Sequence, residues 1–364
     1  MALGHRLALK TDGNTYDANM TNKRHKGDIA NKPTVVLLSL GGTIAMTPAS
    51  SGDSAVPTLD ASDIIAAVPG LDEAAQLRTR SLRRVPGAHL TLDDVVAIAE
   101  EIDTELEGPA DGVVITQGTD TIEEVAFGLD MLVRSDKPVV VTGAMRAPHF
   151  AGADGPANVL AAVQVATSKQ LHGVGTVVVL NSEIHAARLV VKQHTQSPSA
   201  FASPLAGRIG WVAEGKARLA LRPAARPKLE LPSGLKPSRV ALISASLGDD
   251  GTLVTAAATS GYDAIVIEAL GGGHLPATMV DAVDAAIGMM PVVLASRTQS
   301  GEILTKTYGF EGSESDLLAR GALGAGWLNG RKARILLALL LGSTGNAKDA
   351  SERFTAYLEA AAPL

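Results

Sequence analysis

Two threonines stand directly behind glycine at the ends of two apolar, β-branched runs. Residues 35–45 read Val-Val-Leu-Leu-Ser-Leu-Gly-Gly-Thr-Ile-Ala, and residues 112–121 read Gly-Val-Val-Ile-Thr-Gln-Gly-Thr-Asp-Thr. A glycine at a strand exit lets the backbone approach a ligand closely. A threonine hydroxyl becomes a nucleophile when a neighbouring group takes its proton, and Asp120 beside Thr119 adds a carboxylate that can anchor a substrate ammonium. The pattern around Thr43 and Thr119 therefore indicates reaction chemistry rather than phosphate binding.

A lysine amine could complete a proton relay with these hydroxyls, because burial near other cations favours the neutral form of a lysine. Lys192 is the candidate, within residues 188–195, which read Arg-Leu-Val-Val-Lys-Gln-His-Thr. Thr43, Thr119 and Asp120 would then share one site with Lys192.

Short β-branched runs alternate with helical patterns from Pro33 onward, which is typical of α/β domains with parallel sheets. The predicted strands are 34–40, 112–116, 138–142, 174–181, 239–245, 264–268 and 291–296. The predicted helices begin near Thr91, near Thr121 and after Pro156, and continue near 276–288, 330–341 and 347–361. Because parallel strands build ligand crevices at their carboxyl ends, Thr43 and Thr119 are expected to converge there.

The chain of 364 residues is too long for one ordinary core, so two domains are expected. Residues 222–238 are rich in proline and basic residues and lack periodicity, which predicts a linker. The prediction is a catalytic, flavodoxin-like parallel-sheet domain over 33–221 and a smaller parallel-sheet α/β domain over 239–364. Residues 1–32 are polar and patternless and are interpreted as a disordered leader, which is either native or foreign to the protein.

Composition narrows the class of partners. A net charge of −6 argues against nucleic acid and anionic membranes, which need a basic face. The absence of cysteine excludes thiolate nucleophiles and thiolate metal sites. His149, His185 and His194 lack the spacing of metal ligands, so no metal and no cofactor is expected. With no apolar span and no secretory signal in the sequence, a cytoplasmic location is expected.

These motifs resemble the bacterial-type L-asparaginase (asparaginase/glutaminase) family. Residues 40–45 resemble its first signature and residues 117–121 its second. The resemblance extends over roughly 33–364 and includes 142–146, 152–158, Lys192 with Ala200-Phe201, Ser296-Arg297 and 332–334, which read Lys-Ala-Arg.

The resemblance implies a reaction and a role for each motif residue. Thr43 would attack the side-chain amide carbonyl of L-asparagine and form an acyl-enzyme ester, whose hydrolysis completes the release of aspartate and ammonia. Thr119, Asp120 and Lys192 would handle the proton or the water, and Asp120 would also bind the substrate ammonium. Backbone amides after Gly118 and near Ala144 would hold the oxyanion.

The family resemblance also implies a homodimer or homotetramer with its sites at the dimer interface. His274, in the run 271–274, stands where an asparagine would reach the neighbouring subunit's site, and Tyr308 or Glu314 is nearest to a second such position. Asp154 and Asn158 are expected to order the site-facing loop or a subunit contact rather than to react.

The substrate-contacting residues depart from the family pattern. The lid region Met46–Pro57 has no tyrosine, and Gly87 and Ala88 replace a serine and an acid or amide that bind substrate. Gln117 replaces a histidine. We therefore expect weak affinity for asparagine, and expect Gly87→Ser to lower KM if the backbone tolerates a side chain there.

Two alternatives stay open at this point. The same chemistry could act on another small amide, glutamine or an asparagine analogue, as the altered residues Gly87 and Ala88 would permit. A phosphate- or nucleotide-binding module is a lower-ranked alternative, because the sequence lacks the spacing of both common phosphate loops and this reading leaves 117–121 unexplained.

Overall fold

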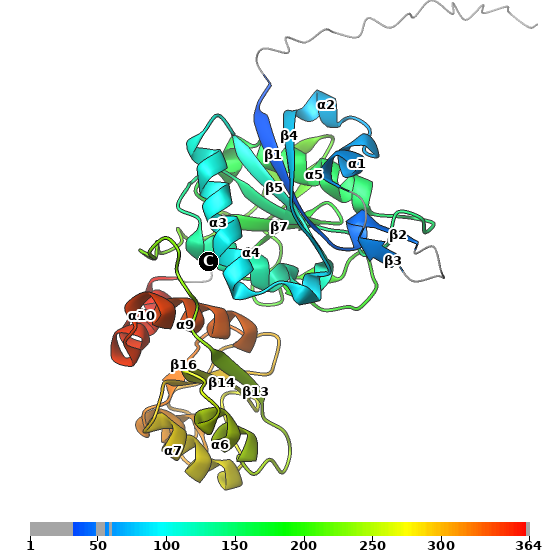
Figure 1. Ribbon diagram of the computed structural model, residues 1–364. Coiled ribbons are helices and arrows are strands. Elements are labelled where there is room, and N and C mark those ends of the chain that lie inside the picture. Colours follow the sequence, from blue (N-terminus) through cyan, green and yellow to red (C-terminus); the bar gives the residue numbers. More distant parts are fainter. Residues whose placement is uncertain (1–31, 49–54, 58–59, 362–364) are drawn as a thin grey trace, which may run out of the picture. The chain divides into compact units, whose positions relative to one another are not determined.

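The computed structural model describes residues 32–48, 55–57 and 60–361, and from Pro33 onward these residues belong to one compact unit (Figure 1). A larger domain is built on an eight-stranded sheet and a smaller one on a four-stranded sheet. The predicted two-domain α/β fold is thus confirmed. Apart from Lys32, the predicted leader 1–32 lies outside the described residues, and so do residues 49–54 of the lid region Met46–Pro57.

The larger sheet has the strand order β12-β11-β8-β7-β6-β5-β1-β4. Its parallel members are β1 (Thr34–Gly41), β4 (Gln76–Val85), β5 (Gly112–Thr116), β6 (Val139–Thr142) and β7 (Thr176–Leu180). Four of these five strands were predicted, with bounds within about two residues of those observed.

Three antiparallel strands extend this sheet at one edge and make it mixed rather than wholly parallel. They are β8 (Glu183–Ala186), β11 (Gly210–Ala213) and β12 (Lys216–Leu219). The reason is local: Asn181 and Ser182 both have positive φ, and so do Glu214 and Gly215. Two such residues in a row form the tight hairpin turn that sends the chain straight back beside the previous strand.

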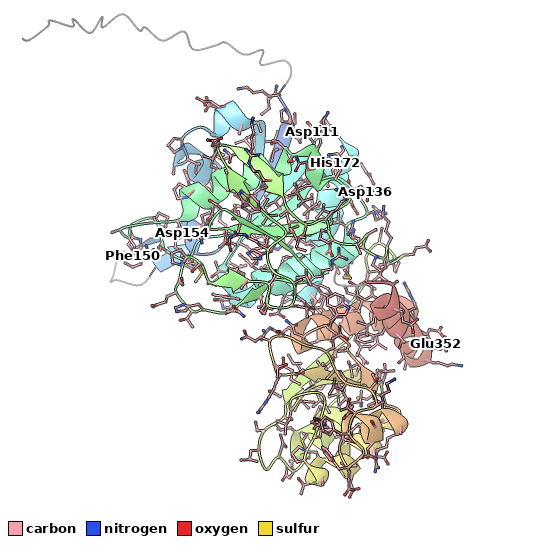
Figure 2. The ribbon with its side chains drawn as sticks, turned by 180° about the vertical axis from the view of Figure 1, so that it is seen from behind. Asp111, Asp136, Phe150, Asp154, His172 and Glu352 are labelled. Atoms are coloured by element: carbon pink, nitrogen blue, oxygen red, sulfur yellow. The ribbon has the colours of Figure 1, made fainter. Side chains whose placement is uncertain are left out.

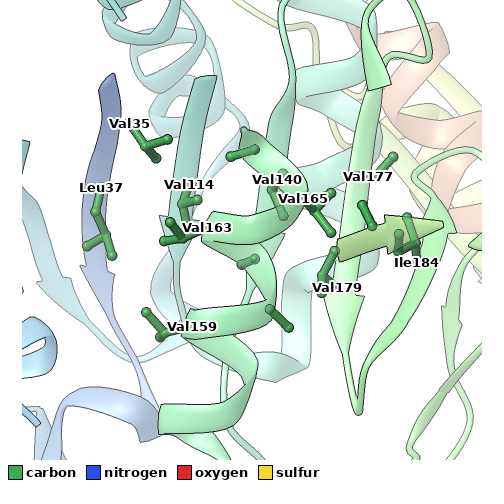
Figure 3. Close-up of a cluster of buried hydrophobic side chains, with 14 of the residues drawn as sticks. Val35, Leu37, Val114, Val140, Val159, Val163, Val165, Val177, Val179 and Ile184 are labelled. Atoms are coloured by element: carbon green, nitrogen blue, oxygen red, sulfur yellow. The ribbon is translucent and has the colours of Figure 1, made fainter. Parts of the chain in front are cut away.

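Helices cover both faces of the larger sheet. α3 (Leu92–Glu107) and α4 (Ile122–Leu132) lie on one face and α5 (Gly155–Ala166) on the other. Figure 3 shows Val35 and Leu37 of β1 among the α5 side chains, whereas their neighbours in the strand pack against α3 and α4. Successive strand residues point to opposite faces, which explains why the strand reads as an unbroken apolar run. Two short helices, α1 (Ala61–Ala66) and α2 (Leu71–Ala74), precede β4.

The smaller domain carries four parallel strands in sequence order. They are β13 (Val240–Ser244), β14 (Ala264–Ala269), β15 (Val292–Ser296) and β16 (Leu323–Gly324). Its helices are α6 (Thr252–Thr259), α7 (Val280–Ile287), α8 (Glu314–Ala319), α9 (Gly330–Thr344) and α10 (Ala347–Ala360). Residues 222–238, the predicted linker, contain neither helix nor strand.

One hydrophobic cluster joins the two domains. Phe127 and Met131 of α4 lie in the same buried cluster as Ile335 and Leu339 of α9. Helix α4, which begins directly after the motif 117–121, is therefore packed directly against α9 of the C-terminal domain.

Candidate functional site

Three loops meet through backbone contact where β1, β4 and β5 end. A Cβ atom built on Gly42 would lie 2.0 Å from the Gly118 amide nitrogen, and one on Gly118 would lie 2.7 Å from the Gly87 amide nitrogen. No side chain fits between atoms at these distances. The glycines are thus what allows the segments carrying Thr43 and Thr119 to touch, as the convergence of the two motifs requires.

Thr43 begins a short 3-10 turn, Thr43–Ala45, and is partly buried. Gly41 and Gly42 before it have φ values of +100° and +81°, which an L side chain rarely adopts. The buried side chain of Ile44 anchors the turn: a Cβ atom on Gly155 would lie 3.0 Å from Ile44 and 3.5 Å from Ala144. The Thr43 turn and the loop that carries Ala144 therefore meet at the start of α5.

The amine of Lys192 joins the two neighbouring residues of the second motif. Its Nζ donates to Thr119 Oγ1 at 2.9 Å and contacts Asp120 Oδ1 at 2.7 Å. Lys192 lies on β9 (Val191–Lys192), which pairs with β10 (Phe201–Ala202). Thr119 is buried, the Lys192 side chain is 15% exposed and the Asp120 side chain 70% exposed. The arrangement connects a buried hydroxyl, through an amine, to a carboxylate that faces solvent.

The residues expected to contact substrate differ in what they can reach. Gln117 is fully buried, and its Nε2 donates to the Gly118 carbonyl oxygen at 3.2 Å, so its side chain acts on the loop it supports. Gly87 is buried and its carbonyl oxygen accepts from Thr121 Oγ1 at 3.0 Å, whereas Ala88 is exposed.

The expectation that Gly87→Ser would improve binding meets a steric obstacle. A Cβ atom on Gly87 would lie 2.9 Å from the Gly118 carbonyl oxygen and 3.1 Å from its carbonyl carbon. Both are backbone atoms of the site, so the space that a serine would need is already filled. The backbone does not tolerate the side chain, and the condition on which that expectation depended is not met.

Asp154 and Asn158 order the loop after β6, which was one of their two expected roles. The Asp154 carboxylate, labelled in Figure 2, accepts from the Met145 amide at 3.0 Å and from the Arg146 amide at 2.9 Å. Asn158 Nδ2 donates to the Gly143 carbonyl oxygen at 3.0 Å. These bonds fix the backbone on both sides of Ala144, where an oxyanion donor was expected.

His274 lies in the smaller domain within an aromatic cluster. Its ring centroid is 4.9 Å from that of Tyr308 and 5.2 Å from that of Phe310, and its Nδ1 lies 3.4 Å from Glu314 Oε2. Burial alone would raise the pKa of the Glu314 carboxyl, but hydrogen bonds from the Tyr308 and Thr307 amides outweigh it and hold that pKa below its usual range. The buried Glu314 carboxylate therefore lies beside the His274 ring, and the Tyr308 side chain is half-exposed.

Glu123 belongs to the site and was not found from the sequence. Its Oε2 accepts from the Lys192 amide at 3.2 Å, and its side chain is 5% exposed. The available signal was its position four residues after Thr119 at the start of α4, where residues i and i+4 share one helix face. A glutamate in a first helical turn is ordinarily explained by the helix dipole alone, so its position in the sequence does not assign Glu123 to the site.

Within 32–48, 55–57 and 60–361, no group of three or more histidine, aspartate and glutamate residues is placed to hold a metal ion. No helix in that same part of the chain is long and apolar enough to cross a membrane.

Comparisons with known proteins agree on both domains. Residues 34–225 match the family model described as Asparaginase, N-terminal, and residues 239–354 match that of the Glutaminase/Asparaginase C-terminal domain. A probable L-asparaginase of Deinococcus radiodurans is 38% identical over 330 residues, which cover 90% of this chain and 98% of that protein. An L-asparaginase of Bacillus licheniformis is 33% identical over 311 residues, covering 85% of this chain and 95% of that protein. The crystal structure of a probable cytoplasmic L-asparaginase from Campylobacter jejuni matches with a TM-score of 0.80 at 31% identity, covering 89% of this chain and 99% of that one.

Proposed function

Since this chain belongs to the asparaginase family, we propose that it hydrolyses the side-chain amide of L-asparagine to L-aspartate and ammonia. The observation that carries the proposal is the Lys192 amine within hydrogen-bond distance of both Thr119 and Asp120. Thr43 follows Gly42, whose backbone touches Gly118 of the second motif, and is proposed to supply the nucleophilic hydroxyl.

In the proposed reaction the Thr43 oxygen attacks the amide carbon, and the hydroxyl proton goes to the amide nitrogen, which leaves as ammonia. Water then attacks the ester that remains on Thr43 and gives a proton to the Thr119 oxygen, while the hydroxyl proton of Thr119 passes to the Lys192 amine. The bond between the acyl carbon and the Thr43 oxygen breaks, aspartate is released, and Lys192 returns the proton through Thr119 to the Thr43 oxygen. Backbone amides after Gly118 and near Ala144 stabilise the oxyanion of both tetrahedral intermediates.

Substrate recognition uses one charge at each end of the amino acid. Asp120 faces solvent and binds the α-ammonium group. The Gly87 amide and the exposed Ala88 segment lie beside Gly118, where the α-carboxylate is held. Gln117 acts by supporting Gly118.

Glutamine is the second candidate substrate, because the matching C-terminal family model is described as Glutaminase/Asparaginase. Glutamine differs from asparagine by one methylene, and such a difference changes transition-state binding by about 1–3 kcal/mol. The ranking of the two amides is therefore a matter of degree in one site rather than of two mechanisms.

The active assembly is proposed to be a homodimer or homotetramer with His274 reaching the partner's site. The exposure of Asp120 supports this assembly. A carboxylate that binds substrate in a closed site must be covered, yet the Asp120 side chain is 70% exposed in the single chain, so a partner subunit is proposed to cover it. We place the enzyme in the cytoplasm, the location named for the Campylobacter jejuni protein.

The test is a panel of amides assayed for ammonia release: L-asparagine, L-glutamine, D-asparagine and succinamic acid. L-asparagine is expected to have the highest kcat/KM of the four amides. The Thr43→Ala variant is expected to release no measurable ammonia from any of them. Binding of ATP or inorganic phosphate, measured in parallel, would favour the phosphate-binding alternative if it occurs while no amide is cleaved.

A further inference from the structure

A buried lysine of the C-terminal domain reaches the chain segment that leads into Lys192. Lys332, in the first turn of α9, is almost completely buried. Its Nζ donates to the Arg188 carbonyl oxygen at 3.1 Å and to the Val190 carbonyl oxygen at 2.6 Å. Those two carbonyls immediately precede β9, the strand that carries Lys192.

The neighbouring residue of α9 reaches the same strand by a second route. Arg331 Nε lies 2.7 Å from Glu123 Oε1, while the other oxygen of Glu123 accepts from the Lys192 amide. Beyond Lys192, Gln193 Nε2 donates to Gln299 Oε1 of the C-terminal domain at 2.6 Å. The backbone is therefore held before and at Lys192, and the side chain of the next residue is bonded as well, each time with a group of the C-terminal domain at the end of the contact.

Burying a lysine amine is costly unless its hydrogen bonds are made, so the buried Lys332 depends on its two bonds to the Arg188 and Val190 carbonyls. A proton relay needs donor and acceptor about 2.6–3.2 Å apart, and a displacement of about 1 Å can cost a hundredfold in rate. The Lys192 amine meets that requirement at 2.9 Å from Thr119.

We propose that Lys332, together with the Arg331–Glu123 ion pair, is a positioning residue for amide hydrolysis that holds β9 so that the Lys192 amine stays on Thr119. The proposal rests on the proposed function in one respect, because it takes Lys192 as the proton relay. It adds to that function a requirement for two residues far from the substrate, in the other domain.

The contact is compatible with either protonation state of Lys332. Burial lowers its pKa to about 7, against the opposing charges of Glu123 and Asp130 on α4 and in concert with Arg331 on its own helix. A neutral amine still carries two N–H groups, one for each carbonyl oxygen. The two hydrogen bonds from Lys332 can therefore form both below and above pH 7, and their effect is expected throughout the pH range of the assay.

The test compares Lys332→Met with Val254→Ala, a substitution in the separate core on the other side of the C-terminal domain's sheet. Lys332→Met is expected to lower kcat by about tenfold to a hundredfold with a much smaller change in KM. Val254→Ala is expected to lower the melting temperature and leave kcat within about twofold of wild type. Equal kcat values for wild type and a folded Lys332→Met would overturn the proposal.

Hydrogen exchange measured by mass spectrometry gives a readout that does not depend on activity. Peptides covering 188–193 are expected to exchange faster in Lys332→Met than in wild type and Val254→Ala, because the variant loses the two bonds that hold the carbonyls of Arg188 and Val190 in this segment. If wild type hydrolyses no amide, the proposed function fails. Unchanged exchange at 188–193 in Lys332→Met is a separate result, and it would refute the positioning role of Lys332.

The pair Arg331→Met and Arg331→Lys decides the matter should Lys332→Met fail to fold. Arg331 is partly exposed, so its loss is compatible with folding. Arg331→Met leaves Glu123 unpaired and is expected to lower kcat several-fold, while Arg331→Lys keeps a cation there and restores most of it. A kcat unaffected by both substitutions would contradict the role given to the ion pair.

Discussion

At the scale of single residues, the roles proposed for the Thr43 and Thr119 hydroxyls can be tested by removing one hydroxyl at a time. Thr43→Ala and Thr119→Ala are each expected to lower kcat about a thousandfold or more, since each removes a nucleophile or its proton partner. Steady-state ammonia release and far-UV circular dichroism are the measurements. Thr43→Ser, which retains a hydroxyl, is the control and should keep part of the activity. Near-wild-type turnover in Thr43→Ala would refute its assignment.

Lys192→Met is expected to lower kcat by about a hundredfold or more, because general acid–base groups contribute about 10²–10⁴ in rate. Lys348→Met, at a site where the side chain is 82% exposed on α10, is the matched control and should change nothing measurable. Both variants are assayed at saturating asparagine. A Lys192→Met enzyme as fast as the control would remove this lysine from the mechanism.

Which site residues can be predicted from the sequence depends on how local their chemistry is. Thr43, Thr119 and Asp120 stand in short motifs, and the structure brings Thr119, Asp120 and Lys192 into contact. Glu123 escapes prediction because its partners come from 192 and 331, and nothing near 123 in the sequence marks them. The contact between Gly42, Gly87 and Gly118 is equally non-local.

At the scale of loops and strands, the packing of Gly87 reverses the expectation drawn from the sequence. Gly87→Ser should lower kcat/KM rather than improve KM, because its Cβ would press on the Gly118 backbone at 2.9 Å and shift the loop that carries Thr119. Ala356→Ser, which adds a hydroxyl at an exposed position of α10, is the control and should be nearly neutral. A lower KM in Gly87→Ser would show that this loop moves freely.

Most of the parallel strands of the two large sheets could be predicted, because buried parallel strands are unbroken β-branched runs. β4 was missed for the opposite reason: it is the edge strand, reads Gln-Leu-Arg-Thr-Arg-Ser-Leu-Arg-Arg-Val and is largely exposed. Charged residues are how natural sheets protect an edge, and they also hide the strand from an apolar pattern. The hairpins at the other edge were missed because their strands have only four residues each.

At the scale of the whole molecule, Lys332 should give stability a measurable pH dependence. Its pKa is lowered from 10.5 to about 7, so between those values the unfolded chain keeps a proton that the folded chain has released. Stability therefore rises with pH in that window, by up to about 1.4 kcal/mol per pH unit from this group. Denaturant unfolding of wild type and Lys332→Met between about pH 6 and 9 measures it. The free energy of unfolding of wild type should rise with pH relative to that of Lys332→Met. Relative to that of the control Lys348→Met, it should not change with pH.

Assembly provides a second test at this scale. If His274 enters the partner's site, Thr43→Ala and His274→Ala are each expected to be impaired, and mixing them under exchange conditions should restore activity in hybrid dimers, which contain one intact site. Light scattering during the assay reports the assembly state. A fully active monomer, or a mixture no better than its parents, would contradict the shared site.

The position of α9 near the end of the chain has a consequence for synthesis on the ribosome. Residues 43, 119 and 192 leave the ribosome well before Arg331 and Lys332, and N-terminal domains fold first during synthesis. We expect a nascent chain that has released only its first domain to hold the reactive hydroxyls without the contacts that align the lysine. Catalysis would then reach its full rate only once translation is nearly complete, so that incomplete chains consume asparagine slowly.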